Sequence, residues 1–215
     1  MISLVVRIFG AIFLIIAPFL LLVRGAVYIH ASHGTNAWIS VLVSAGLSAM
    51  LIFVYLSFIR GRLTRKKRTT SGMKVRFILS LIFVFGFAFQ GLMYISAENV
   101  KQSSLQKEFR QLHPILRLGV STILIIDRKA IMTDAQRVSE DYRKMGLTKK
   151  QNSLHYKQND GFVYAVDLRT NGRSAVRNWL LKTYFNAMGF QTLRHMGTAD
   201  HLHVSLQNPD RPWAR

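Results

Sequence analysis

The sequence predicts two unlike parts: an α-helical membrane region of three helices, then an α+β domain with a small antiparallel sheet. Three long apolar runs fill residues 1–97, which contain no Asp or Glu, and all ten acidic residues lie from Glu98 onward. From Glu98 the pattern changes to short strand-like and helix-like segments separated by turn residues, which is typical of a mixed α+β domain. We therefore expect a membrane region over residues 1–97, a helical stalk over 98–118 and a folded domain over 119–215.

The first predicted span covers residues 8–23 and continues as an apolar run to Ile29. Arg7 and Arg24 stand near its two ends, where long basic side chains can reach the lipid headgroups. A secretory signal peptide also begins with a basic residue before an apolar core. This run is long for that role, and no convincing small-x-small cleavage site follows it, so a retained anchor is favoured.

The second and third predicted spans cover residues 37–59 and 75–96, each long and apolar enough to cross a bilayer. Small residues within them can allow helices to approach closely, although such residues are also common in membrane helices generally. They are Ser44, Ala45, Gly46, Ser48 and Ala49 in the second span, and Gly86 and Gly91 in the third.

The loops between the spans predict the orientation of the chain. Residues 60–76 carry eight Lys and Arg, whereas residues 30–36 carry none. The positive-inside rule places the basic loop and the amino terminus in the cytoplasm, and the domain on the other side. In a Gram-negative-type cell this means an inner-membrane protein with a periplasmic domain. Nucleic-acid binding is the competing explanation of the basic run, but a short loop between two spans is better explained by topology.

The part from Glu98 onward carries 19 Lys and Arg against 10 Asp and Glu, a net charge of +9, and the chain has no cysteine. No disulfide therefore supports the domain. The expected elements are a helix over 99–112 that continues the third span, a buried strand over 123–126, a helix from Thr133 or Asp134 to Met145, a strand over 162–167, a helix over 174–188 ended by Gly189, and paired strands over 190–194 and 202–206.

A candidate metal site follows from residue types at the strand ends. Residues 200–206 alternate polar and apolar, so His201, His203 and Ser205 share one strand face. Asp167 ends the strand over 162–167, and His155 lies in the polar loop before it. Two His and one Asp form a three-ligand zinc site with an open fourth position, as catalytic zinc requires. His-x-His pairs also occur on solvated strand faces, which is the alternative.

These residues resemble a known family. The patterns Ser153-x-His155, Ala165-x-Asp167 and Asp200-x-x-His203, with His201 two positions before His203, resemble the LAS zinc peptidases. That group includes lysostaphin-type enzymes, D-alanyl-D-alanine carboxypeptidases, murein endopeptidases and the hedgehog amino-terminal domain. The resemblance is closest to the carboxypeptidase branch and covers roughly residues 123–206, with none of the membrane part.

The resemblance implies that His155, Asp167 and His203 bind Zn²⁺ and that Asp200 is the catalytic base. It also implies an upstream side chain that steadies the substrate carbonyl, for which Arg128 and Arg137 are both candidates. One feature departs from the family. The family usually has seven positions from the first His to the Asp, whereas here the spacing is twelve, and the polar loop over 156–161 must accommodate the extra residues.

For His201 and Asp200, a purely structural role is the alternative to a catalytic one. His201 is positioned to stabilise a developing oxyanion, or is simply a neighbour on the strand face. Asp200 is positioned as a base, or closes the turn before the strand. The expected function is a membrane-anchored zinc peptidase that hydrolyses amide bonds in peptidoglycan stem peptides, with peptidoglycan and the lipid bilayer as partners. The alternative is a non-catalytic, metal-containing module of the same fold that binds cell-wall or protein ligands.

Overall fold

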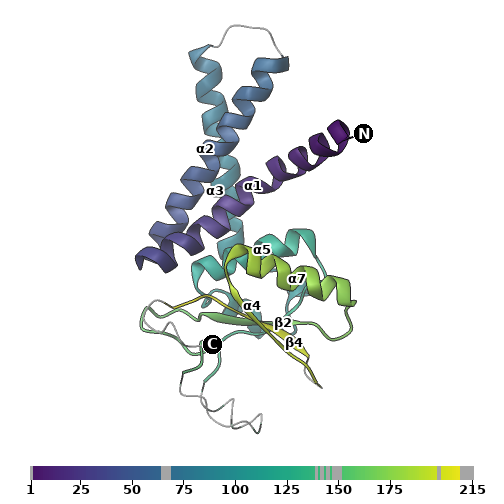
Figure 1. Ribbon diagram of the computed structural model, residues 1–215. Coiled ribbons are helices and arrows are strands. Elements are labelled where there is room, and N and C mark those ends of the chain that lie inside the picture. The colour runs from purple at the N-terminus through teal and green to yellow at the C-terminus, as the bar shows by residue number, and fades with distance from the viewer. Residues whose placement is uncertain are drawn as a thin grey trace.

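The computed structural model describes residues 2–63, 69–138, 140, 143, 146, 152–197 and 200–208. Three long helices form one end of the molecule, and a four-stranded sheet with shorter helices forms the other (Figure 1). The helices α5 and α7 lie between the sheet and the long helices (Figure 1).

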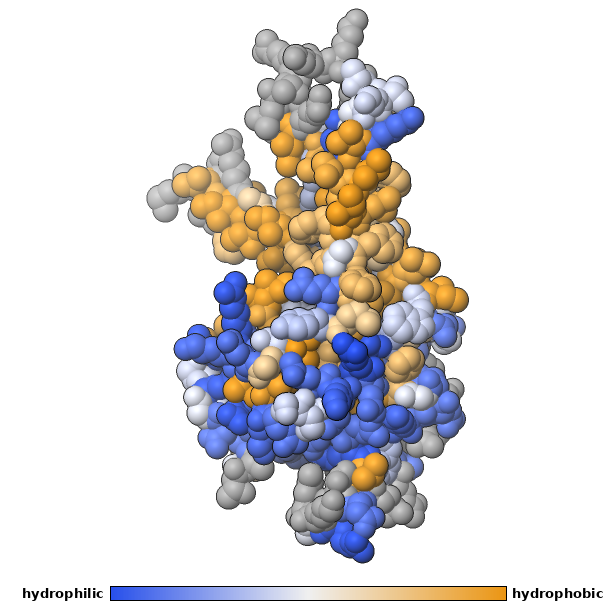
Figure 2. Space-filling model, turned by 180° about the vertical axis from the view of Figure 1, so that it is seen from behind, coloured by the Kyte–Doolittle hydropathy of each residue, from blue (hydrophilic) through white to orange (hydrophobic). Residues whose placement is uncertain are grey.

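The three predicted spans are confirmed as apolar helices. They are α1 (Ile2–His33), α2 (Ala37–Leu63) and α3 (Thr70–Met93). Each contains a segment long and apolar enough to cross a membrane: Ile8–His33, Ala37–Ile59 and Thr70–Met93. Figure 2 shows apolar surface over these helices, whereas most of the domain surface is hydrophilic. The chain is therefore a membrane protein by the length and composition of its helices.

Small residues allow α1 and α2 to pack closely. The Ser48 hydroxyl donates to the Pro18 carbonyl across the contact at 2.8 Å, and a Cβ on Gly25 would lie 3.0 Å from Ser44 Oγ. Ala45 and Ala49 are buried in the same helix face. The predicted role in close packing does not extend to Gly46 and Gly86, because an added Cβ there would meet nothing within 4 Å.

The predicted continuous helix from the third span through residue 112 is wrong. Helix α3 ends at Met93, and Tyr94 takes an extended conformation. A 3-10 turn η1 (Ala97–Asn99) and a short helix α4 (Ser104–Phe109) follow. The chain breaks there because Leu105 and Phe109 turn into the domain core, where each is at most 2% exposed. The predicted limits of the three parts stay predictions.

The predicted strand over residues 123–126 is also wrong, because these residues end helix α5 (Pro114–Ile126). Proline stands at the start of this helix, and the His113 side chain accepts from the Ile115 backbone N–H at 3.3 Å. Helix α5 packs against α1, α2, α3 and α7, so most of its circumference is buried. A helix buried on nearly all sides has a continuous apolar sequence, which resembles that of a buried strand.

The sheet contains β1 (Met132–Asp134), β2 (Ala165–Arg169), β3 (Gln191–His195) and β4 (His201–Ser205), in the order β1-β2-β4-β3 with antiparallel neighbours. The predicted β3–β4 hairpin is confirmed, and the strand predicted over 162–167 is shifted to β2. A helix does not begin at Thr133 or Asp134, because both belong to β1, in which Asp134 pairs with Asp167 of β2 and Thr133 lies at a shift in the register. Much of the remaining predicted helix, to Met145, lies outside the described residues.

The predicted helix over 174–188 is confirmed as α7 (Ala175–Met188). The Ser174 hydroxyl accepts from the Arg177 backbone N–H, and Gly189 ends the helix at φ +92°. Glycine is required at this position both by the positive φ and by the close approach of α1. A Cβ there would lie 1.8 Å from the Arg24 guanidinium and 3.0 Å from Val27, so α1 rests directly on the carboxy-terminal end of α7.

Alternation along the strands divides the sheet into two faces. Leu168, Leu202 and Val204 lie on one face and are at most 1% exposed. The other face carries Asp167 and His203, which are opposite one another on β2 and β4. Helix packing therefore fills one face, while the polar residues predicted to be functional occupy the other.

Candidate metal centre

Two of the three predicted ligands are placed by strand pairing. Asp167 on β2 and His203 on β4 are register partners, so their side chains leave the sheet side by side. The distance from His203 Nδ1 to Asp167 Oδ1 is 2.9 Å. Asp167 is 2% exposed and His203 is 9% exposed, so both are buried in the part of the chain that the structure describes.

The third predicted ligand, His155, is delivered by the long loop before β2. The loop closes a tight turn in which Gln158 N–H donates to Phe162 O at 2.9 Å and Gly161 takes φ +82°. The chain then returns alongside itself, and Tyr164 N–H donates to Leu154 O at 3.0 Å. The turn thus closes the twelve-residue interval, and His155 reaches Asp167.

The three ligand atoms have the spacing of a tetrahedral site. His155 Nε2 lies 3.2 Å from His203 Nδ1 and 3.3 Å from Asp167 Oδ1. Zinc bound at its usual distances to nitrogen and oxygen holds tetrahedral ligand atoms about 3.3 Å apart. Together with the 2.9 Å separation of His203 and Asp167, this geometry allows the group to hold a metal ion.

Backbone contacts orient the His155 ring for this role. Its Nδ1 lies 2.5 Å from the Ala135 carbonyl oxygen, which can only accept, so Nδ1 carries the proton. In the neutral ring Nε2 then has a lone pair, directed at Asp167 and His203. A hydrogen bond from the second ring nitrogen to a carbonyl is the usual way in which a metal-binding histidine is held.

The Asp167 carboxyl is held in its charged form. Burial opposes its ionisation, but His155 and His203, in their protonated forms, keep the pKa of Asp167 well below its ordinary value through their charge and hydrogen bonds. Arg137 adds a further contact, because its Nη2 donates to Asp167 Oδ2 at 2.6 Å. One carboxylate oxygen thus faces the two histidines and the other is held by a guanidinium.

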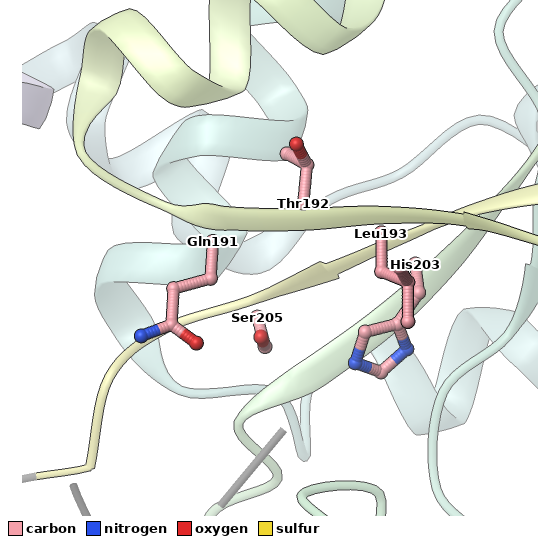
Figure 3. A pocket seen from close by; sticks show the side chains of 5 residues that line it. All are labelled: Gln191, Thr192, Leu193, His203 and Ser205. Carbon is pink, nitrogen blue, oxygen red and sulfur yellow. The ribbon is translucent and has the colours of Figure 1, made fainter. Parts of the chain in front are cut away.

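A groove of about 330 Å³ opens beside His203. Gln191, Thr192, Leu193 and Ser205 line it with His203. Figure 3 shows Gln191, Ser205 and His203 projecting to one side of the hairpin and Thr192 to the other. The groove adjoins the candidate metal centre, because His203 belongs to both.

His201 lies on the same strand face as His203, as its alternation predicts. Its Nε2 is 3.5 Å from Asp167 Oδ2, and its side chain is 23% exposed. Its ring stacks on His195 of β3, with ring centroids 4.9 Å apart. His201 is therefore the partly exposed titratable side chain adjacent to the three ligands.

Asp200 has partners of its own. Its carboxylate accepts from Arg194 Nε at 3.1 Å, from Arg194 Nη2 at 2.7 Å and from the Thr170 hydroxyl at 2.6 Å. These contacts, Arg194 first and Thr170 next, lower the pKa of Asp200 to about 2. Its backbone carbonyl also accepts from the N–H groups of Thr170 and Asn171. These contacts join Asp200 to β3 and to the segment after β2, while the predicted closure of the turn over 197–199 falls partly outside the described residues and, like the role as a base, stays a prediction.

Arg137 and Arg128, which the sequence does not distinguish, have different surroundings. Arg137 bridges Asp167 and Asp134, with its Nε 2.6 Å from Asp134 Oδ2. Arg128 is exposed in the turn after α5, where its backbone carbonyl accepts from Asn99. Only Arg137 is brought to the candidate metal centre.

We expect Arg137→Gln to weaken zinc binding by about tenfold to a hundredfold, because loss of the contact frees the Asp167 carboxylate to turn. Arg128→Gln removes the same charge and should leave zinc affinity unchanged. Competition titration with a zinc-binding dye measures both variants. Equal affinities in Arg137→Gln and the parent would show that Asp167 needs no such support.

Three further residues at the centre were not predicted. The alternation of residues 191–195 places Gln191 and His195 on the ligand face once the hairpin register is known. The sequence alone leaves that register open, because residues on either side of a turn can pair in several ways. Asp134, three positions before Arg137, was assigned to a helix cap.

No protein-family model, curated protein or solved structure matches this chain.

Proposed function

We propose that this protein is a membrane-anchored zinc peptidase that hydrolyses amide bonds in peptidoglycan stem peptides. The observation that carries the proposal is the convergence of His155 Nε2, Asp167 Oδ1 and His203 Nδ1 at separations of 2.9–3.3 Å beside an open groove. Three protein ligands leave one position for water or substrate, as in catalytic rather than structural zinc sites. The motif resemblance to LAS zinc peptidases supports the same reaction class.

The chain's own residues supply the remaining requirements of amide hydrolysis. When bound, zinc supplies a nucleophile from water at neutral pH and polarises a carbonyl. The groove residues Gln191 and Ser205 offer hydrogen-bonding groups that orient a peptide next to His203. His201 lies within 3.5 Å of Asp167 Oδ2 and is partly exposed, so it can accept a proton and return it to the leaving amine.

The substrate class rests on charge and attachment. The part of the chain from Glu98 onward has 19 basic against 10 acidic residues, and stem peptides carry carboxylates. Three membrane helices keep the domain next to the bilayer. A cell-wall peptide close to the membrane surface fits both features.

The test is incubation of the full chain in detergent with purified peptidoglycan, with products identified by mass spectrometry. We expect shortened stem peptides or separated cross-links, lost with a chelator and restored by added Zn²⁺. Zinc-loaded protein that leaves every peptide intact would exclude the peptidase.

A metal-containing binding module is the second candidate. It is favoured by the contacts of Asp200, because Arg194 and Thr170 engage the carboxylate that the family uses as its base. Such a module retains peptidoglycan on a column without cleaving it. The same incubation distinguishes the two candidates, since binding without products supports the module.

We propose an inner-membrane location with the domain in the periplasm. The support is the segment over residues 60–76, from the end of α2 to the start of α3, whose eight Lys and Arg favour the cytoplasmic side. Alkaline phosphatase fused after Arg215 should be active in cells, and the same enzyme fused near Lys67 should not. The reverse pattern would invert the topology and remove peptidoglycan as the substrate.

A further inference from the structure

Five apolar side chains outside the membrane helices are exposed on one side of the domain. Val176, Trp179 and Leu180 on α7 are 66%, 62% and 52% exposed. Ile125 and Ile126 at the end of α5 are 54% and 74% exposed. We call these five residues the juxtamembrane patch.

The two helices bring these residues together. Near the end of α7, the Tyr184 hydroxyl donates to the Gly119 carbonyl of α5 at 2.8 Å. At its beginning, Arg173 forms an ion pair with Asp127, which directly follows Ile126. The helices therefore run in opposite directions, and the end of α5 lies beside the beginning of α7.

Helix α7 has an outward apolar stripe in addition to its core face. Val176, Leu180 and Ala187 follow one another at helical spacing on its exposed side, with the polar Thr183 between the last two, while Leu181 and Phe185 face the core. A helix that only covers a sheet needs one apolar stripe. The second stripe leaves large apolar side chains exposed to solvent, and contact with another apolar phase would bury them.

The membrane helices indicate what this apolar phase is. Helix α1 rests on the end of α7 through Arg24 at Gly189, and from there α1 rises away from α7 toward its own amino terminus (Figure 1). The juxtamembrane patch thus belongs to the two helices, α5 and α7, that lie between the sheet and the membrane helices (Figure 1).

Basic residues border the juxtamembrane patch. Arg177 and Lys182 are exposed on the two flanks of the α7 stripe, and Arg128 and Lys129 are exposed just after Ile126. An apolar helix face with Trp and flanking Lys or Arg is typical of helices that lie in the bilayer interface, where cations meet anionic headgroups.

We infer that the juxtamembrane patch is a second, monotopic membrane contact, through which α7 and the end of α5 lie in the headgroup region of a bilayer containing anionic lipid. The contact fixes the height of the sheet above the membrane. It does not depend on a metal ion or on peptidase activity.

The test uses the full chain in nanodiscs of phosphatidylcholine and phosphatidylglycerol. Because the chain has no cysteine, Val176→Cys and, separately, Thr183→Cys each introduce a unique site for a spin label. We expect both labels to be relaxed several-fold more by oxygen than by a water-soluble nickel chelate, as for a label at Val54→Cys on α2. Oxygen preference at either site should decrease in discs of phosphatidylcholine alone.

The matched control is Met196→Cys, an 81% exposed apolar residue in the β3–β4 turn, where the chelate should dominate. Labels at 176 and 183 that respond like the one at 196 would overturn the inference. Labels shielded from both reagents, with dipolar broadening between chains, would also overturn it, since a second copy would then cover the face.

Discussion

Replacing His155 or His203 with Ala should reduce bound zinc from one ion per chain to almost none and abolish hydrolysis. Each side chain supplies one of the three converging atoms that could bind the metal. Loss of a residue that only supports a ligand costs about tenfold to a hundredfold in metal affinity, so loss of a ligand itself should cost more than about a hundredfold. Metal content by mass spectrometry of the purified protein measures the effect.

Asp167→Asn tests the same centre with a side chain of nearly the same size. It removes the charge that faces both histidines and should also release the metal. His201→Ala is the matched control, because His201 shares the strand face and approaches Asp167 but is not one of the three converging residues. A folded His155→Ala protein that keeps its full zinc would show that another residue supplies the third ligand.

His201→Gln should lower the hydrolysis rate by about a hundredfold or more at unchanged zinc content, the usual loss for a general acid–base group. The reason is position: His201 adjoins the candidate metal centre and is partly exposed, whereas the carboxylate of Asp200 is engaged by Arg194 and Thr170. Steady-state rates on peptidoglycan fragments, with metal content measured in parallel, provide the comparison.

Asp200→Asn separates the two assignments of the base. If Asp200 only closes the turn through Arg194 and Thr170, the Asn variant should melt at a lower temperature but hydrolyse within severalfold of the parent. If Asp200 is the base, as the family motif implies, the Asn variant should instead lose about a hundredfold in rate and keep its zinc. If the Asp200→Asn variant hydrolysed slowly and the His201→Gln variant hydrolysed at the parent's rate, the base would be Asp200 and not His201.

The sequence alone predicts those elements whose structure depends on residues close together in the chain. The three membrane helices follow from uninterrupted apolar runs, because a polar backbone in lipid must satisfy its hydrogen bonds within the helix. Helix α7 was predicted with both ends because Ser174 and Gly189 act within one turn of it. The β3–β4 hairpin follows from two short strands close in the chain.

The predictions were wrong where contacts with residues far away in the chain override the local preference of the sequence. Residues 123–126 have the composition of a buried strand, yet they form helix because α5 has neighbours around most of its circumference. Thr133 and Asp134 have a good capping sequence, but both belong to strand β1, which pairs with β2. Helix α3 stops at Met93 because Leu105 and Phe109 are drawn into the domain core.

For the candidate metal centre too, the sequence predicts some features and only the tertiary structure shows the others. The sequence by itself determined the candidate residues His155, Asp167 and His203 and the strand face of His201 and His203, because alternation is a property of one strand. Only the tertiary structure decided that His155 crosses a twelve-residue interval to within 3.3 Å of Asp167, that Arg137 rather than Arg128 supports that carboxylate, and that Arg194 engages Asp200. Loop closure, strand register and ion pairing join residues far apart in the chain, and their energies depend on the whole fold.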